Sequence, residues 1–149
     1  MNHNRKELVK ELISLYSEVP TFRCLPDCTD CCGPVFFSGL EFSRVKPFMQ
    51  PNSMKCPYSK NARCSIYDKR PMVCRLFGNV AYDKLTCSFK CGPAFKISHE
   101  HGLWLINQTL RLSQAAGYGL DFVHTHKALL NHISPTKVKV SLTGYDFKR

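Results

Sequence analysis

The sequence predicts a small, mainly α-helical domain with an irregular, cysteine-rich core and at most one or two short strands. The chain has 149 residues, which suits one domain and is too short for two ordinary ones. Helical periodicity occurs near both ends, and nine cysteines lie between them among prolines and glycines. We therefore expect a single domain over 1–149, with its core in 24–91 and packing helices in 98–133.

The first element is an amphipathic helix over residues 4–18. Leu8, Leu12 and Tyr16 recur at helical spacing and fall on one face. Pro20 cannot continue the helix and ends it. Such a face predicts a helix that packs on the core.

A short helix is expected to begin at residue 39. Ser38 is followed three residues later by Glu41, the pattern of a capping box. The helix is expected to run to about Phe48. Residues 20–34 before it and 49–66 after it are predicted to be irregular, because prolines and other helix breakers interrupt them.

A second short helix is predicted over 69–77. Asp68 is expected to cap it, and Pro71 lies in the first turn, where a missing amide hydrogen costs little. Gly78 ends the helix. Cys74 would then lie one turn inside it.

The C-terminal third has no cysteine and reads as two helices and a strand. Ser98 is expected to cap a helix that runs to about Ala116, and a second helix is expected over 120–133. Residues 137–142 alternate with period two and carry lysines, which predicts an edge strand.

Aromatic and histidine side chains are given structural roles. Histidines are expected to be exposed or to cap helices, although histidine can also ligate metals. Six aromatic side chains are expected in the core: Phe36, Phe37, Phe42, Phe48, Phe95 and Trp104.

The cysteines favour a metal site. The N-terminal residues lack the apolar run of a secretory signal, and no run of about 18 apolar residues exists for a membrane span. A cytoplasmic location follows, where disulfides are rare, and an odd count fits poorly with a closed disulfide framework. The predicted metal ligands are Cys24, Cys28, Cys31, Cys32, Cys56, Cys64, Cys74, Cys87 and Cys91.

The spacing of the cysteines leaves the metal and the exact ligands open. Gaps of two and three residues let the first four wrap one centre, and thiolates suit zinc or iron in sulfide clusters. Adjacent Cys31 and Cys32 diverge, so one binds and the other packs, or they serve different irons or different centres. One centre and two centres both remain open.

Part of the chain resembles a known family. The quartet Cys24-x3-Cys28-x2-Cys31-Cys32, then Cys56-Pro57, then CSIYDKRPMVCRLF over 64–77 resemble the YkgJ-type cysteine-cluster family, a zinc- or iron-chelating CxxCxxCC domain. The resemblance covers about a third of the chain. The first gap is three residues here, where the family's pattern has two.

The resemblance implies a chelating role for the cysteines within 24–74, with either Cys31 or Cys32 taking part. The family includes the cysteine-rich part of flagellin lysine methylases, which are associated with an iron–sulfur cluster. This favours an iron–sulfur cluster, most of all [4Fe–4S], over Zn²⁺. Arg70 and Arg75 flank Cys74 in the matched string and are expected to donate hydrogen bonds to thiolates or to an anionic ligand.

The leading functional prediction is a metal-binding protein with a structural or redox centre. The formal charge of +10 favours an acidic protein or nucleic acid as a partner besides the metal. One alternative is a methylase-like enzyme or modification factor acting at the cluster. Another is a zinc-stabilised basic module that binds nucleic acid or protein. Whether the chain is an enzyme stays open.

Overall fold

The computed structural model describes residues 4–33, 35–45, 55–120 and 122–124 and is mainly α-helical. Its helices are α1 (Arg5–Ser17), α2 (Gly39–Phe42), α3 (Met72–Leu76) and α4 (His99–Ala115), with 3-10 turns at Tyr67–Lys69 and Asp83–Leu85. Its strands are β1 (Phe36–Phe37), β2 (Ser59–Lys60), β3 (Arg63–Cys64) and β4 (Val123–His124). The mainly α class is confirmed, although the described residues form four very short strands rather than one or two.

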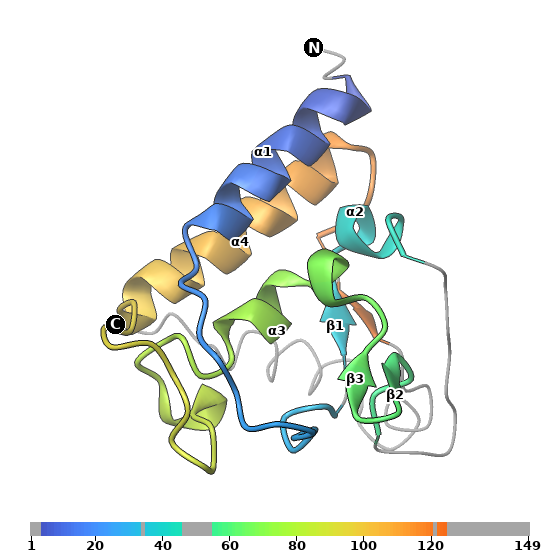
Figure 1. The fold of residues 1–149 in the computed structure, drawn as a ribbon. Helices are drawn as coiled ribbons and strands as arrows, with labels where there is room; N and C mark the ends of the chain where they lie inside the picture. Colours follow the sequence, from blue (N-terminus) through green and yellow to red (C-terminus); the bar gives the residue numbers. More distant parts are fainter. Residues whose placement is uncertain (1–3, 34, 46–54, 121, 125–149) are drawn as a thin grey trace, which may run out of the picture.

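The two long helices, α1 and α4, lie side by side and antiparallel (Figure 1). Asn4 caps α1 by accepting from the Lys6 amide, and Ser98 caps α4 as predicted, because its hydroxyl accepts from the His101 amide. Buried side chains of α1, α3 and α4 form the larger of two hydrophobic clusters. It includes Leu8, Leu12, Tyr16, Met72, Leu76, Val80, Leu105 and Ile106.

The capping box predicted for α2 is present. The Ser38 hydroxyl accepts from the Glu41 amide, and the Glu41 carboxylate accepts from the Ser38 amide at 2.8 Å. The helix ends at Phe42, earlier than the predicted end at Phe48. Phe48 itself and residues 46–54 lie outside the described part of the chain.

The predicted start of α3 is wrong. Asp68 lies in a 3-10 turn and caps nothing, and α3 begins only at Met72. Arg70 precedes a proline and is extended, with ψ of 138°. A residue before proline is disfavoured in the helical region, so the helix cannot begin until after Pro71.

Glycines allow close packing at the ends of α3 and α4. Gly78 has φ of +77°, in the left-handed region, and ends α3 as predicted. A Cβ at Gly78 would lie 2.8 Å from the Phe22 ring, and one at Gly102 would lie 2.7 Å from Val80 Cγ2. The absence of a side chain at Gly102 therefore lets α4 approach the segment that follows α3.

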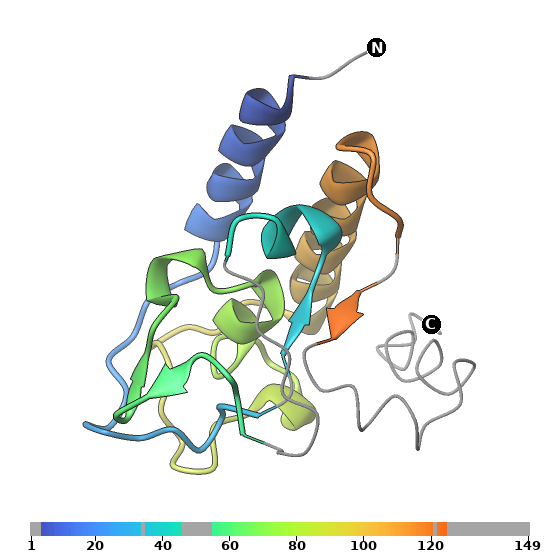
Figure 2. The same ribbon diagram turned by 90° about the vertical axis from the view of Figure 1, so that its right-hand side faces the viewer.

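The helix predicted over 120–133 is wrong where the structure describes it. Val123 and His124 form β4, which pairs antiparallel with β1 in the register Phe36↔His124 and Phe37↔Val123 (Figure 2). Pairing with β1 overrides the local helical pattern, as distant contacts do for short segments. The rest of that predicted helix and the predicted strand at 137–142 lie outside the described residues.

A second, smaller hydrophobic cluster includes a buried side chain of β1. It consists of Val35, Phe37, Val45 and Tyr58, with the partly buried Cys56, Ile66, Cys74 and Val123 packed against it. Thus two cysteines already pack against apolar side chains, and this cluster connects the cysteine-rich segment to the rest of the fold.

The expectation for the aromatic side chains is partly wrong. Phe37 is fully buried and Phe36 and Phe42 are half-buried, but Trp104 is 44% exposed and Phe95 is 87% exposed. The Trp104 ring stacks on His101, with centroids 5.4 Å apart, on the outer side of α4. Within the described residues, no helix is long and apolar enough to cross a membrane.

Candidate metal centre

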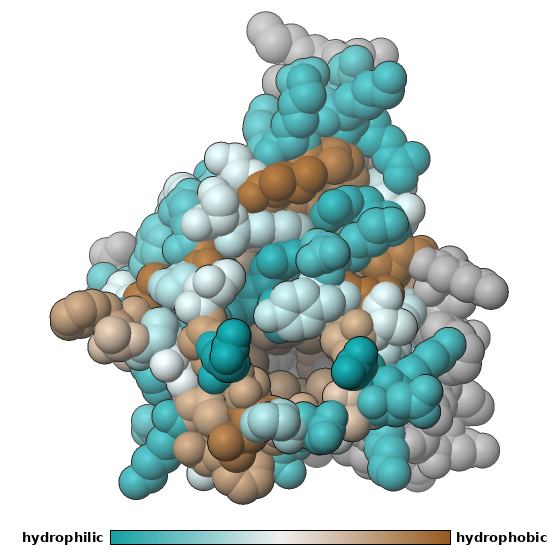
Figure 3. Space-filling model, viewed as in Figure 1, coloured by the Kyte–Doolittle hydropathy of each residue, from teal (hydrophilic) through white to brown (hydrophobic). Residues whose placement is uncertain are grey.

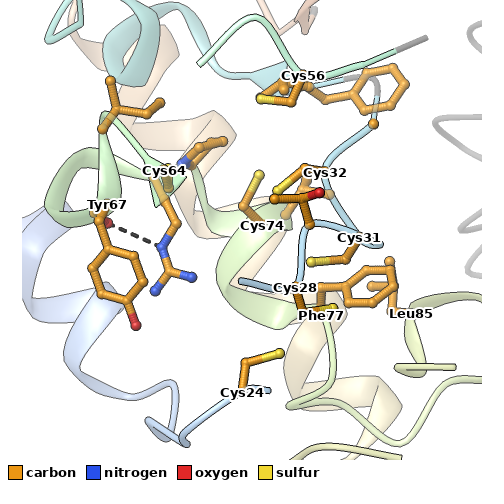
Figure 4. Close-up of a pocket in the computed structure, with 18 of the residues that line it drawn as sticks. Cys24, Cys28, Cys31, Cys32, Cys56, Cys64, Tyr67, Cys74, Phe77 and Leu85 are labelled. Carbon is orange, nitrogen blue, oxygen red and sulfur yellow. Dashed lines mark hydrogen bonds between the residues drawn. The ribbon is translucent and has the colours of Figure 1, made fainter. Parts of the chain in front are cut away.

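Seven of the nine cysteines line one cavity of about 760 Å³, the cysteine cavity (Figure 4). They come from the loop before β1, from the hairpin β2–β3 with the turn before it, and from α3. In the space-filling view, both weakly hydrophobic and hydrophilic side chains border a hollow in the lower half of the molecule (Figure 3). The seven are Cys24, Cys28, Cys31, Cys32, Cys56, Cys64 and Cys74.

The hairpin β2–β3 holds two of these cysteines at its open end. Ser59 pairs with Cys64, and the Ser59 amide donates to the Cys56 carbonyl at 3.1 Å. The Cys56 amide in turn donates to the Cys32 carbonyl at 3.3 Å. These main-chain bonds bring segments that are distant in sequence to the same wall of the cavity.

Cys74 is positioned from the opposite side by a buried carboxylate. Glu41 is 2% exposed, and its Oε1 accepts from the Met72 amide at 2.7 Å and from the Tyr16 hydroxyl at 2.9 Å. Glu41 thus caps α3 in place of Asp68, besides completing its own capping box. Burial raises the pKa of Glu41, and burial together with Glu41 raises the pKa of Tyr16.

The capping box was visible in the sequence, but this second role of Glu41 was not. It depends on a contact between residues 31 positions apart. A buried carboxylate that accepts one hydrogen bond in its capping box can still accept others. This remaining acceptor capacity is the only sign in the sequence of a second partner.

Four of the cavity thiols are close enough to influence one another's pKa, and we call them the inner thiol group. They are Cys32, Cys56, Cys64 and Cys74. Burial raises the pKa of Cys74, and the Cys56 and Cys64 thiols add to the effect. A hydrogen bond from the Cys31 thiol lowers the pKa of Cys32, against burial and the other three thiols. In Figure 4, Cys32 and Cys74 point toward one another.

Arg70 and Arg75, the predicted anion-binding pair, lie differently. Arg70 lines the cysteine cavity, donates from Nε to the Tyr67 carbonyl at 3.0 Å, and lies 3.8 Å above the Tyr67 ring. The positive charge of Arg70 lowers the pKa of Cys74 and so partly offsets the increase caused by burial. Arg75 instead donates to the carbonyls of Arg70 and Asp68 and is not among the residues that line the cysteine cavity.

The two remaining predicted ligands, Cys87 and Cys91, do not line the cysteine cavity. Cys87 is buried and faces a neighbouring cavity of about 620 Å³, which Cys24, Cys31 and Cys74 also line. Cys91 is half-buried, and its thiol contributes to the raised pKa of Cys24. The structure therefore places seven of the nine cysteines around the cysteine cavity and the other two outside its lining.

Across the described residues, no three histidine, cysteine or acidic side chains are arranged to hold a metal ion. All nine cysteines are free thiols. The histidines of α4 lie apart from the cysteine cavity. His99 stacks on Tyr82, with centroids 4.3 Å apart, and its Nε2 is buried without a hydrogen-bond partner among the described residues. His101 Nε2 lies 3.1 Å from Glu18.

No family model, curated protein or solved structure matches this chain. The resemblance to the YkgJ-type cysteine-cluster family therefore depends on the cysteine spacing and the string over 64–77 alone.

Proposed function

We propose that the chain is a metal-binding protein whose inner thiol group holds an iron–sulfur cluster in a structural or redox role. The observation that carries the proposal is the convergence of seven cysteines from three segments on one cavity. Thiolates are the donors that iron–sulfur clusters use, and a donor set made only of sulfur fits that group. When bound, such a cluster supplies one-electron redox chemistry.

The size of the cysteine cavity favours a cluster over a single zinc ion. Four thiolates around one Zn²⁺ each lie about 2.3 Å from the ion, which requires a tightly closed set. Seven described thiols line a cavity of about 760 Å³. A cluster places several irons and sulfides between its cysteine ligands, so its ligands stand farther apart. Zn²⁺ remains the alternative metal.

The inner thiol group and Arg70 are suited to a metal centre held by thiolates. Without a metal, thiols that raise one another's pKa stay protonated. A bound metal stabilises the thiolate form instead. Arg70 supplies the one cationic group whose charge acts on both Cys31 and Cys74 among the neighbours described. We assign Arg70 to hydrogen bonding near the centre and Arg75 to holding the 68–70 turn.

An enzyme acting at the cluster is the second candidate, and the size of the cavity favours it. Small-molecule sites typically measure about 300–1,000 Å³ and have mainly apolar walls. Beside the cysteines, Phe36, Phe77, Leu85 and Phe122 line the cavity. An organic substrate would have room next to the centre.

The test is metal analysis of protein purified without oxygen. We expect stoichiometric iron and sulfide with broad visible absorption that bleaches on reduction with dithionite. Cys64→Ser and Cys74→Ser should abolish the absorption and the iron, because each removes an inner thiol. Cys87→Ser is the matched control and should retain both, since Cys87 faces the neighbouring cavity.

If the protein is colourless and contains one tightly bound zinc, the metal at these thiols is Zn²⁺ and not an iron–sulfur cluster. Metal-free protein that stays folded and binds neither iron nor zinc would overturn the proposal.

A further inference from the structure

The cavity beside the cysteine cavity carries a concentration of positive charge. It measures about 620 Å³, and three arginines line it: Arg23, Arg70 and Arg75. Among the described residues that line it there is no aspartate or glutamate. We call this space the arginine cavity. Its charge favours a ligand that is an anion.

Arg75 and Arg70 are held in place by bonds that use only part of each guanidinium. Arg75 donates from Nε and Nη2 to the carbonyls of Arg70 and Asp68, and lies 3.9 Å from the centroid of the Tyr16 ring. Arg70 donates from Nε to the Tyr67 carbonyl, the bond drawn as a dashed line in Figure 4. Among the described residues, no carboxylate forms an ion pair with either arginine. Both therefore keep N–H groups for a ligand.

Arg23 reaches the arginine cavity from the segment that follows α1. A Cβ placed on Gly78 would lie 2.8 Å from the Phe22 ring, so this segment packs against the end of α3. Arg23 is exposed, and within the described part of the chain it makes no hydrogen bond or ion pair. Its whole guanidinium is available to a ligand.

A buried amide supplies a second kind of contact. Asn79 lines the arginine cavity and is 5% exposed. Its Nδ2 donates to the Arg75 carbonyl at 2.7 Å, which fixes the orientation of the amide. Its Oδ1 is buried and has no hydrogen-bond partner among the described residues. A buried acceptor without a donor is costly, so a ligand that donates a hydrogen bond to it gains affinity.

We propose that the arginine cavity binds a phosphate group, either as inorganic phosphate or as part of a small organic molecule. Guanidinium groups bind phosphate oxygens through paired, charge-assisted hydrogen bonds. A carboxylate has two oxygens and one charge, whereas a phosphate group has about three free oxygens and nearly two charges and so suits three arginines better. The hydroxyl of hydrogen phosphate, or one of the organic part, supplies the donor for Asn79.

The volume of the arginine cavity, about 620 Å³, is typical of sites for small organic ligands, which measure about 300–1,000 Å³. Cys74 and Arg70 line both cavities. A bound phosphate group therefore lies next to the inner thiol group without occupying it. This site goes beyond the proposed function and does not depend on which metal the inner thiols hold.

The experiment is calorimetric titration of the anaerobically purified protein, with its inner centre in place, in a phosphate-free buffer at mildly alkaline pH. The probes are inorganic phosphate, glycerol phosphate and sulfate. Sulfate is a dianion of the same shape as hydrogen phosphate but has no hydrogen to donate. We therefore expect phosphate to bind about tenfold more tightly than sulfate, the contribution of one hydrogen bond to a buried acceptor. The tighter of the two phosphate probes identifies the source of the group.

Arg23→Gln should weaken phosphate binding by about fivefold, as expected for one exposed charge. Arg111→Gln is the matched control. It removes the same charge from an exposed position of α4 that lines neither cavity, and should leave the affinity unchanged. Asn79→Ala should bring the affinities for phosphate and sulfate close together. That ratio is measured within one variant, so it does not depend on the variant's stability.

Three results would overturn the phosphate site. They are the absence of phosphate binding by the wild-type chain, equal affinities for phosphate and sulfate, and equal weakening by Arg23→Gln and Arg111→Gln. None of them bears on the inner centre, which metal analysis of the Cys74→Ser variant tests separately.

Discussion

At the scale of single residues, the tip of the β2–β3 hairpin holds backbone strain. Asn61 and Ala62 have φ of 50° and 57°, the left-handed pair that a two-residue turn between twisted strands requires. Asn tolerates this conformation, but for Ala the contact of Cβ with the backbone costs about 1–2 kcal/mol. The hairpin that carries Cys64 thus has a residue poorly suited to its turn.

Ala62→Gly should therefore stabilise the protein. The relief of strain exceeds the about 0.4–1 kcal/mol that glycine costs through the unfolded chain, so a net gain of about 0.5–1 kcal/mol is expected. For a chain of this size that raises Tm by about 1–4 °C in a thermal melt. Ala94→Gly is the control, because Ala94 is exposed and lacks a positive φ. It should leave Tm unchanged or lower it, and a decrease in both variants would refute the argument.

At the scale of elements, the buried Glu41 links α2 to α3. Its two carboxylate oxygens accept from three donors: the Ser38 amide, the Met72 amide and the Tyr16 hydroxyl. A side-chain amide could not replace it, because its NH₂ group would face a donor. The sequence motif therefore fixes α2, and the same side chain fixes where Cys74 stands.

Glu41→Gln should destabilise the protein by about 1–3 kcal/mol, the cost of leaving a buried donor unsatisfied. The free energy of unfolding from urea titration measures this change. The variant should also lose metal more quickly during purification, since α3 carries Cys74. Glu11→Gln, on the exposed face of α1, is the matched control and should change neither quantity. Equal stability of the two variants would contradict the role of Glu41.

Local patterns predicted the elements that depend on neighbouring residues. The α1 face, the α2 capping box and the Ser98 cap of α4 are all readable within a few positions. The start of α3 depends on a partner 31 residues away in sequence, and the strand β4 on partners 86 and 88 residues away. No local pattern contains those contacts, so sequence-based reasoning missed them. The cysteine count indicated a site, but only the fold shows which cysteines line the cavity.

At the scale of the whole molecule, the protein has two parts that are stabilised in different ways. The larger hydrophobic cluster joins α1, α3 and α4 and contains no cysteine among its buried residues. Among the described residues the smaller cluster has four buried members, and Cys56 and Cys74 pack against it. Around the cysteine cavity, the loop over 24–33 and the hairpin contribute few buried apolar side chains. The stability of this cysteine-rich part therefore depends on the metal more than the stability of the helical part does.

Metal removal should therefore unfold one part of the molecule before the other. Structural metal sites contribute on the order of 10 kcal/mol, far more than the small cluster can supply. In hydrogen exchange of anaerobically demetallated protein, amides over 24–33 and 56–70 should lose protection. Amides in the middle of α1 and α4 should remain protected, because their shared apolar face stays buried. Loss of protection in α1 and α4 at the same rate would mean that the metal centre and the helical core unfold as one cooperative unit.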